Sequence, residues 1–247
     1  MNSLAMALLL LADLCMLAAG LYYGAKFLRR QHNLLLGLEW LVIGLSGTNV
    51  LFLAATGVSH SSFSYHLMVF FDAFSRSFGM TLIIVLGMMA VTHGYRPSWW
   101  VEVGAVAAAV AVGLNRAFDV RPVEFGWSTF YLVMNLAVAL FMFAVAVRLW
   151  RIGDRRNATW VFVATALGAF VAVIYDFVHI PGDDAEHTLF YILAMSVWAL
   201  MLVTYYHGYN VLAVSRRSSA STCREQTRIV AQTRRMNALR AEQARES

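Results

Sequence analysis

The sequence predicts an all-α integral membrane protein that folds as a seven-helix transmembrane bundle. Hydrophobic residues make up 60% of the 247-residue chain and charged residues only 13%, whereas about a quarter of the residues in a soluble protein carry charge. The mean hydropathy, +0.63, is high. A chain with so few charged residues cannot form a sufficiently polar surface to face water, so we expect lipid around its helices.

Seven apolar runs, each close to the roughly 20 residues that cross a bilayer, are separated by polar clusters. They place the spans at residues 3–27, 34–57, 66–94, 99–116, 128–150, 158–180 and 187–212. All three prolines fall between spans, so no span is expected to carry a proline kink. In the fourth span, Ala105, Ala109 and Gly113 recur at four-residue spacing, which predicts close packing against a neighbouring helix.

The connections between the spans alternate in charge. Basic residues border the first, third and fifth connections and fill the C-terminal tail, which puts all but three of the 19 Lys and Arg residues on one side. The opposite connections are acidic, with Asp119, Glu124, Asp183, Asp184 and Glu186. Because positive residues favour the cytoplasmic side, we expect the N-terminus outside and the C-terminus in the cytoplasm. Short loops and frequent arginine are typical of a bacterial inner membrane.

The chain divides into a transmembrane domain, 1–214, and a basic cytoplasmic tail, 215–247. The serine-rich start of the tail predicts a flexible segment. From Arg224 onward a helical pattern sets in, and its apolar positions are the predicted interaction residues Ile229, Met236 and Leu239. This pattern is typical of a short coiled coil or of a basic helix on anionic lipid. The alternative is a disordered tail whose arginines only fix the topology.

Five charged residues fall inside the predicted spans: Asp13, Glu39, Asp72, Arg76 and Asp176. Each costs a few kcal/mol at the bilayer centre unless it is paired or solvated. Asp72 and Arg76 are four residues apart and share a helix face with Tyr65 and Gly79. An arginine keeps its proton and therefore requires a carboxylate.

We expect Arg76 at the centre of a polar cluster, paired with Asp72 and with either Asp13 or Asp176. All four lie in the outer half of the bundle, whereas Glu39 stands alone nearer the cytoplasm. Together with Tyr65, the four predict an outward-facing site for a ligand or a proton. The alternative is a buried ion pair that only fixes the register of the helices.

Histidines near the outer ends of the spans are weak candidates for a metal site, namely His66, His179 and His187. No close pair such as H-x-x-x-H is present. The seven-helix plan resembles that of the rhodopsins in architecture only. A retinal Schiff base needs a lysine in the last span, and the only lysine is Lys26 in the first, so retinal is excluded. We expect no cofactor and no catalytic residues.

Three functions follow from these observations. The first is a receptor-like sensor or scaffold for signal transduction, in which the outer polar site is coupled to the basic tail. The second is a small proton-coupled transporter that uses the intramembrane Asp and Arg residues. The third is a metal-dependent membrane hydrolase. The expected partners are membrane lipids and a cytoplasmic protein that contacts the tail, with an oligomer left open and no nucleic acid.

Overall fold

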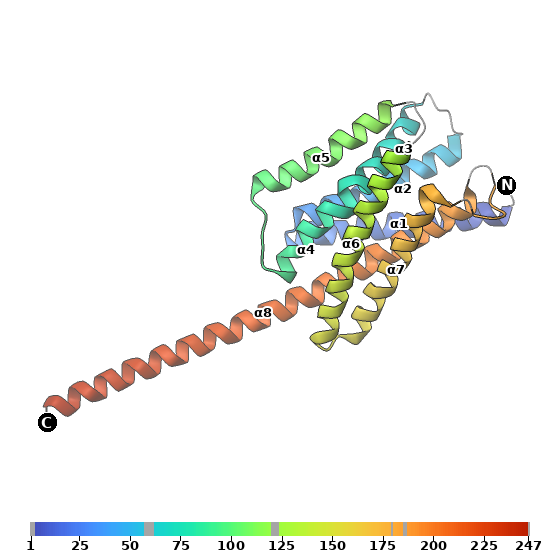
Figure 1. Cartoon of the computed structure of the whole chain (residues 1–247). Coiled ribbons are helices and arrows are strands. Elements are labelled where there is room, and N and C mark those ends of the chain that lie inside the picture. Colours follow the sequence, from blue (N-terminus) through green and yellow to red (C-terminus); the bar gives the residue numbers. More distant parts are fainter. Residues whose placement is uncertain (1–2, 57–61, 120–123, 179, 185–186, 247) are drawn as a thin grey trace.

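The computed structural model describes residues 3–56, 62–119, 124–178, 180–184 and 187–246, and this part of the chain contains helices and their connections but no strand (Figure 1). The elements in chain order are α1 (Ser3–Lys26), η1 (Phe27–Gln31), α2 (Leu34–Thr56), α3 (Phe63–Phe74), η2 (Ser75–Ile83), α4 (Ile84–Thr92), α5 (Trp99–Phe118), α6 (Phe125–Arg151), α7 (Arg155–Phe177) and α8 (Thr188–Glu246). The two η segments are π-helical.

Seven helical segments in the described residues are long and apolar enough to cross a membrane, which confirms the predicted number of spans. The ends of the first six segments lie within four residues of those predicted, whereas the seventh runs to Ser221 and not to residue 212. The third span is composite, because α3, η2 and α4 run on without a break from Phe63 to Thr92. The sequence predicted spans without proline kinks. A π-helical segment nevertheless interrupts the regular α-helix of this span, although the span contains no proline.

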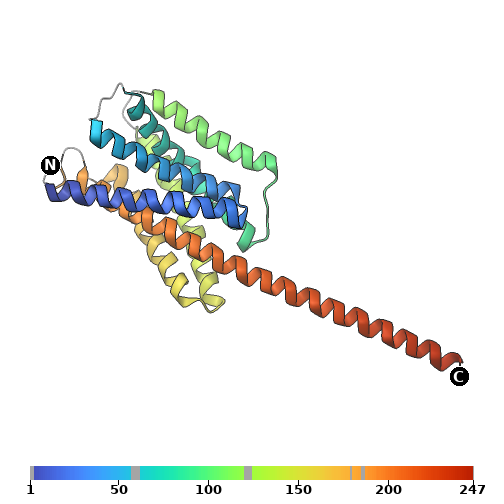
Figure 2. The same cartoon turned by 180° about the vertical axis from the view of Figure 1, so that it is seen from behind.

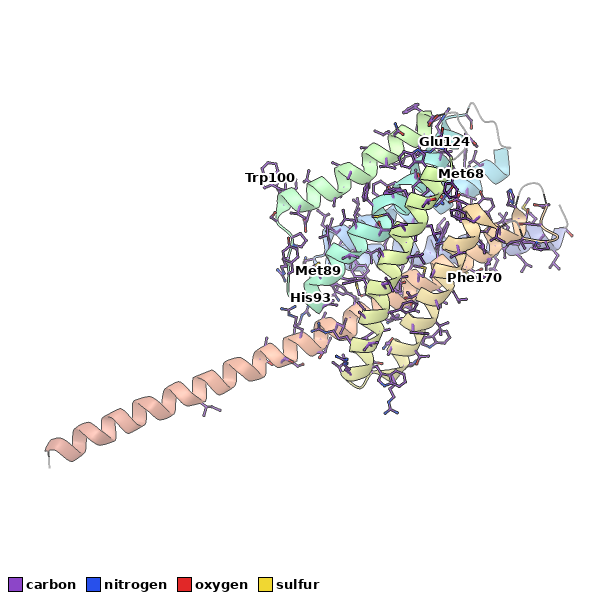
Figure 3. The ribbon with its side chains drawn as sticks, in the orientation of Figure 1. Met68, Met89, His93, Trp100, Glu124 and Phe170 are labelled. Atoms are coloured by element: carbon purple, nitrogen blue, oxygen red, sulfur yellow. The ribbon has the colours of Figure 1, made fainter. Side chains whose placement is uncertain are left out.

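The two described ends of the chain lie at opposite ends of the bundle (Figures 1 and 2). The end that holds the start of α1 is called the N-terminal end. The opposite end, from which α8 projects as a single rod, is called the tail end. α1 packs between α2 and α8, α6 packs along α7, and α5 covers α3. In Figure 3, Glu124 and Met68 mark the N-terminal end, while His93 and Trp100 mark the tail end.

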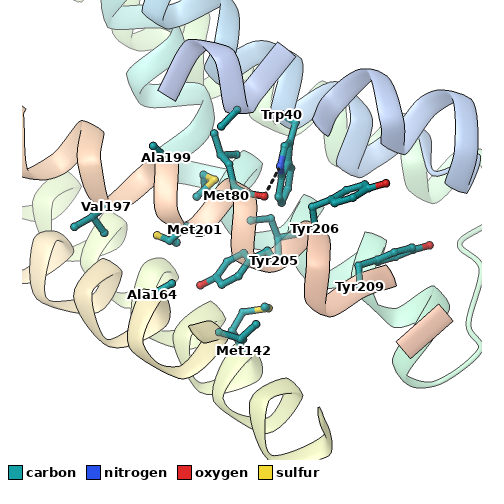
Figure 4. Close-up of a cluster of buried hydrophobic side chains, with 14 of the residues drawn as sticks. Trp40, Met80, Met142, Ala164, Val197, Ala199, Met201, Tyr205, Tyr206 and Tyr209 are labelled. Carbon is teal, nitrogen blue, oxygen red and sulfur yellow. Dashed lines mark hydrogen bonds between the residues drawn. The ribbon is translucent and has the colours of Figure 1, made fainter. Parts of the chain in front are cut away.

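One part of the core is an aromatic cluster around Trp40 of α2, which is fully buried against η1 and α8. Its indole Nε1 donates a hydrogen bond of 3.0 Å to the carbonyl of Leu202, so no polar atom of the ring is left unsatisfied (Figure 4). The ring of Phe27 stands edge-on to the rings of Trp40, Tyr206 and Tyr209, with centroids about 5 Å apart. This cluster fills the bundle toward its tail end.

Two pairs of helices approach each other through small residues. A Cβ added at Gly20 of α1 would lie 2.7 Å from backbone atoms of Gly44 and Trp40, so the backbones of α1 and α2 are in direct contact. The predicted stripe on α5 is also used, because Ala109 is fully buried and Gly113 faces Phe70 of α3. The first contact fixes α1 against α2, and the second fixes α5 against the third span.

The last helix does not break at the serine-rich start of the tail, where the sequence predicted a flexible segment. α8 instead runs on to Glu246. The serine side chains are satisfied within the helix, since Ser219 Oγ donates to the carbonyl of Ser215 at 3.0 Å. Ile229 is 56% exposed. Met236 and Leu239 lie on the same helix, but their side chains are outside the described residues.

The contact at Gly20 should be sensitive to a single methyl group. Because the atoms that Gly20→Ala would meet belong to the backbone, we expect a loss of about 1–3 kcal/mol of stability. Thermal unfolding in detergent, followed by circular dichroism, measures this loss. Gly104→Ala is the matched control, since a Cβ there meets nothing within 4 Å. Equal melting temperatures for the two variants would contradict the proposed backbone contact.

Candidate functional site

The site is built on the third span, where the helix changes from α to π geometry. α3 begins at Ser62, whose Oγ accepts a hydrogen bond from the backbone N–H of Tyr65 at 3.2 Å. Asp72 lies in the last turn of α3, and Arg76 is the second residue of η2. The two side chains form the predicted ion pair, with Arg76 Nη1 3.3 Å from Asp72 Oδ2. π-helical turns recur at functional sites.

Arg76 binds a second carboxylate on another span. Its Nη2 donates a hydrogen bond to Asp176 near the end of α7. Of the two predicted alternatives, Asp13 and Asp176, it is therefore Asp176 that completes the ion pair. The guanidinium is held by two carboxylates from two helices, and its side chain is only 10% exposed.

Two tyrosine rings lie against the same guanidinium. Its Cζ is 3.7 Å from the ring centroid of Tyr175 on α7 and 4.4 Å from that of Tyr131 on α6. Both distances are within the range of a cation–π interaction. On α6, Asn135 also donates a hydrogen bond of 3.5 Å to the backbone carbonyl of Arg76. Residues of α6 and α7 thus surround a residue of the third span.

The acidic partner Asp72 differs from Asp176 in its exposure. One of its oxygens accepts a hydrogen bond of 2.7 Å from Tyr175, and the other faces Arg76. The Asp72 side chain nevertheless remains 33% exposed, against 12% for Asp176. Asp72 is therefore the one charged partner of Arg76 that an incoming molecule can reach.

Asp72 and Arg76 line a cavity of about 650 Å³. Its mouth lies at the N-terminal end, where Tyr65, His66, Arg116 and Asp119 line it. Its floor is formed by residues of the core, among which Met80, Met201 and Tyr205 appear in Figure 4. Most of the lining is apolar or aromatic.

One wall of the cavity belongs to α8. The residues that α8 contributes recur at helical spacing: Tyr191, Met195, Trp198, Met201 and Tyr205. From the first to the last of these residues the helix rises about 21 Å, at 1.5 Å per residue. The cavity therefore extends deep into the bundle, and α8 follows it for that depth.

The mouth of the cavity is structured by two further contacts. Arg116 and Asp119, at the end of α5, form an ion pair of 2.9 Å. The ring nitrogen Nδ1 of His66 donates a hydrogen bond of 2.7 Å to the carbonyl of Ala117. The second contact ties the end of α5 to α3 beside the opening.

Asp13 does not join the cluster, although it was predicted as a site residue. It lies on α1, a helix that packs on α2 and α8, and its side chain is buried. Its Oδ1 would be 2.8 Å from a Cβ placed on Gly47, and neither carboxyl oxygen has a hydrogen-bond partner within the described residues. The sequence predicted how deep Asp13 lies in its span. It did not predict that Asp13 faces Gly47 of α2 and not Arg76.

The predicted position of Gly79 also needs correction. Gly79 does not share the cavity face of Tyr65; it faces Glu39 of α2, whose Oε1 would be 2.7 Å from an added Cβ. The π-helical turn that begins at Ser75 changes the angular spacing on which the prediction rested. The absence of a side chain at Gly79 leaves room for the buried carboxyl group of Glu39.

The histidines are placed separately. His66 lines the mouth of the cavity, and His187 is exposed just before α8. His179 lies outside the described residues. Among the residues that are described, no group of three or more His, Cys, Asp or Glu side chains could hold a metal ion.

Sequence reasoning predicted Tyr65, which lines the cavity, but it missed Tyr131 and Tyr175, the two tyrosines against Arg76. Tyr131 and Asn135 are four residues apart on α6, and this pairing in an otherwise apolar span was the available signal. Tyr175 adjoins Asp176 in sequence, but only the fold shows that both face Arg76.

Comparison of the chain with protein-family models, with curated proteins and with solved structures finds no match.

The ion pair between Arg76 and Asp176 can be tested by a double-mutant cycle. Asp176→Leu removes one of the two carboxylates bound to the buried guanidinium, and because Asp72 still compensates the charge we expect a loss of about 1.5–3 kcal/mol of stability. Arg76→Leu should then cost less in the Asp176→Leu background than in the parent protein, because the contact between the two side chains is already gone. The free energy of unfolding in mixed micelles measures both effects. Strictly additive losses would show that the two side chains do not interact.

Proposed function

We propose that this chain is a multi-pass membrane sensor, which binds a ligand in the cavity beside Arg76 and reports its presence through α8. One observation carries the proposal. The helix that forms a wall of the cavity is the same uninterrupted helix that leaves the bundle and continues to Glu246. A ligand that displaces the wall therefore displaces the tail.

The length of α8 suits this role. From Tyr191, at the cavity, to Glu246 the helix rises about 83 Å at 1.5 Å per residue. Only its first part, Thr188–Ser221, qualifies as a span. The remainder projects beyond the bundle as a rod (Figure 1). A small tilt of such a rod at the cavity becomes a large displacement at its far end.

Besides the shared wall of the cavity, a hydrogen bond connects α8 to the third span, which carries Asp72 and Arg76. At the tail end, Arg216 of α8 donates a hydrogen bond of 3.0 Å to the carbonyl of Ala90 in α4. Arg148 of α6 donates to the neighbouring carbonyl of Thr92. Cationic side chains are favoured at a helix C-terminus, where backbone carbonyls are left without partners. The third span thus contacts Asp176 near its middle and α8 at its tail end.

The distribution of charge supports an orientation for this sensor. With the basic side in the cytoplasm, the cavity mouth faces the outside and the α8 rod projects into the cytoplasm. The sensor would then read an external signal at Asp72 and present the basic tail to a cytoplasmic partner. A bacterial inner membrane fits this arrangement.

A transporter has less support from the same structure. Movement of a solute across the bundle needs a path from the cavity floor to the tail end. That region is filled by the fully buried Trp40, Phe27 and Met142 and by the tyrosines packed on them (Figure 4). The contacts of α8 favour transmission of a movement rather than passage of a solute.

Coupling between the site and the tail can be measured with spin labels. A Cys15→Ser, Ile152→Cys background leaves one label on α8 at Cys223 and one at the turn between α6 and α7. Arg76→Leu should shift or broaden the distance distribution between the labels, because Asp72 and Asp176 then lose their shared cation and rearrange. The control, Leu140→Ala, alters a side chain on α6 that is 71% exposed and should leave the distribution unchanged. An identical distribution in Arg76→Leu would contradict the coupling.

The orientation has its own test. In a Cys15→Ser background, Cys223 should resist a membrane-impermeant maleimide in intact spheroplasts and react after lysis, because the tail is expected in the cytoplasm. A Ser3→Cys variant of the cysteine-free protein should react in both cases. If Cys223 is labelled in intact spheroplasts, the proposed orientation is wrong.

A further inference from the structure

We propose that the cavity recognises an amphipathic organic cation, a protonated amine on an apolar body, with Asp72 as its anchor. This inference rests on the proposed function, because it names the ligand class of the same site. It goes further by assigning the charge, the shape and the contact residue of the molecule that the sensor would detect.

The first step is that Arg76 already binds partners within the protein. Its guanidinium binds Asp72 and Asp176 and lies against the rings of Tyr131 and Tyr175. An anionic ligand could bind it only by displacing one of these carboxylates, and the displaced carboxylate would then lose its counterion in an apolar surrounding. The arrangement therefore disfavours an anion.

The second step concerns the charge that is left over. Two carboxylates share one guanidinium, so the cluster has one negative charge in excess. At the mouth, Arg116 and Asp119 pair with each other and add no net charge. Of the two carboxylates at the cluster, Asp72 is the one that lines the cavity and is one-third exposed. Each of its oxygens accepts one hydrogen bond, from Arg76 or from Tyr175, and a carboxylate has about four lone-pair sites, so it can accept further donors.

The third step is the composition of the wall around Asp72. Aromatic rings from three helices line the cavity with it: Tyr65, Phe71, Tyr175, Tyr191 and Trp198. Such rings attract a cation through their faces and accommodate an apolar body at the same time. Methionines at 68, 80, 195 and 201 add polarizable, adaptable surface to the lining of the cavity. A hydrophilic cation would leave this apolar lining unused.

The inference can be tested with three probes that share one skeleton. The probes are 4-phenylbutylammonium, 4-phenylbutanol and 4-phenylbutyrate, which carry a cationic, a neutral and an anionic head. Each is titrated into the purified full chain in neutral detergent by calorimetry, and titration into protein-free micelles is subtracted. We expect the ammonium to bind about ten-fold more tightly than the alcohol, because a charge-assisted hydrogen bond to Asp72 is available only to the cation.

Variants at Asp72 test whether this carboxylate causes the preference for the ammonium probe. Asp72→Asn should remove the advantage of the ammonium over the alcohol, and Asp72→Glu should restore it in a folded protein. Glu102→Gln is the matched control, since it removes one carboxylate from the tail end of α5 and should leave the preference intact. Size-exclusion chromatography confirms that each variant is folded. If Asp72→Asn keeps the ten-fold preference, Asp72 is not the anchor.

Other outcomes overturn the inference as a whole. Tightest binding of the butyrate would identify an anion site at Arg76, and equal binding of all three probes would show that charge is not recognised. Failure of every probe to bind up to its solubility limit would also overturn it. These failures are distinct from failure of the sensor. Ammonium binding without any change in the Cys223–152 distance would overturn the sensor and leave the cation site standing.

Discussion

A guanidinium inside an apolar bundle cannot give up its proton, so the surrounding helices must supply its counterions. Arg76 obtains one from Asp72 on its own span and one from Asp176 on α7. α6 adds the ring of Tyr131 and the amide of Asn135, which reaches the backbone beside the charge. Three spans are therefore fixed around a single side chain. Any event that changes the charge balance at this point must change the relation between those spans.

The cavity is a consequence of the same cluster. The polar groups occupy the wall formed by the third span, α6 and α7, while α8 closes the space with aromatic and methionine side chains. Asp72 lies at the boundary between the two regions, since it is bound to Tyr175 and Arg76 on one side and open to the cavity on the other. A ligand that reaches Asp72 thus competes with contacts that hold the bundle together. Recognition and conformational change would then share the same interaction.

The sequence was sufficient for the spans, because the length of an apolar run and its polar ends depend on composition alone. It was also sufficient for the pair of Asp72 and Arg76, because four-residue spacing is a local property of a helix. It could not choose between Asp13 and Asp176, since depth in the membrane says nothing about which helices are neighbours. The π-helical turn that begins at Ser75 contains no proline, so nothing in the sequence signals it. Tyr131 and Tyr175 acquire their role only through contacts between spans.

The third span is held by two arginine contacts of different strength, one near its middle and one at its tail end. Arg76 is buried and bound to carboxylates, and breaking such a pair is costly. Arg216 lies at the tail end and donates to one backbone carbonyl from an exposed position, an interaction worth only about 1.5–3 kcal/mol even when the donor is charged. A displacement that starts at the cluster would therefore break the Arg216 contact first. Release of Arg216 would free α8 from α4 just where α8 leaves the bundle, while the rest of the fold remains intact.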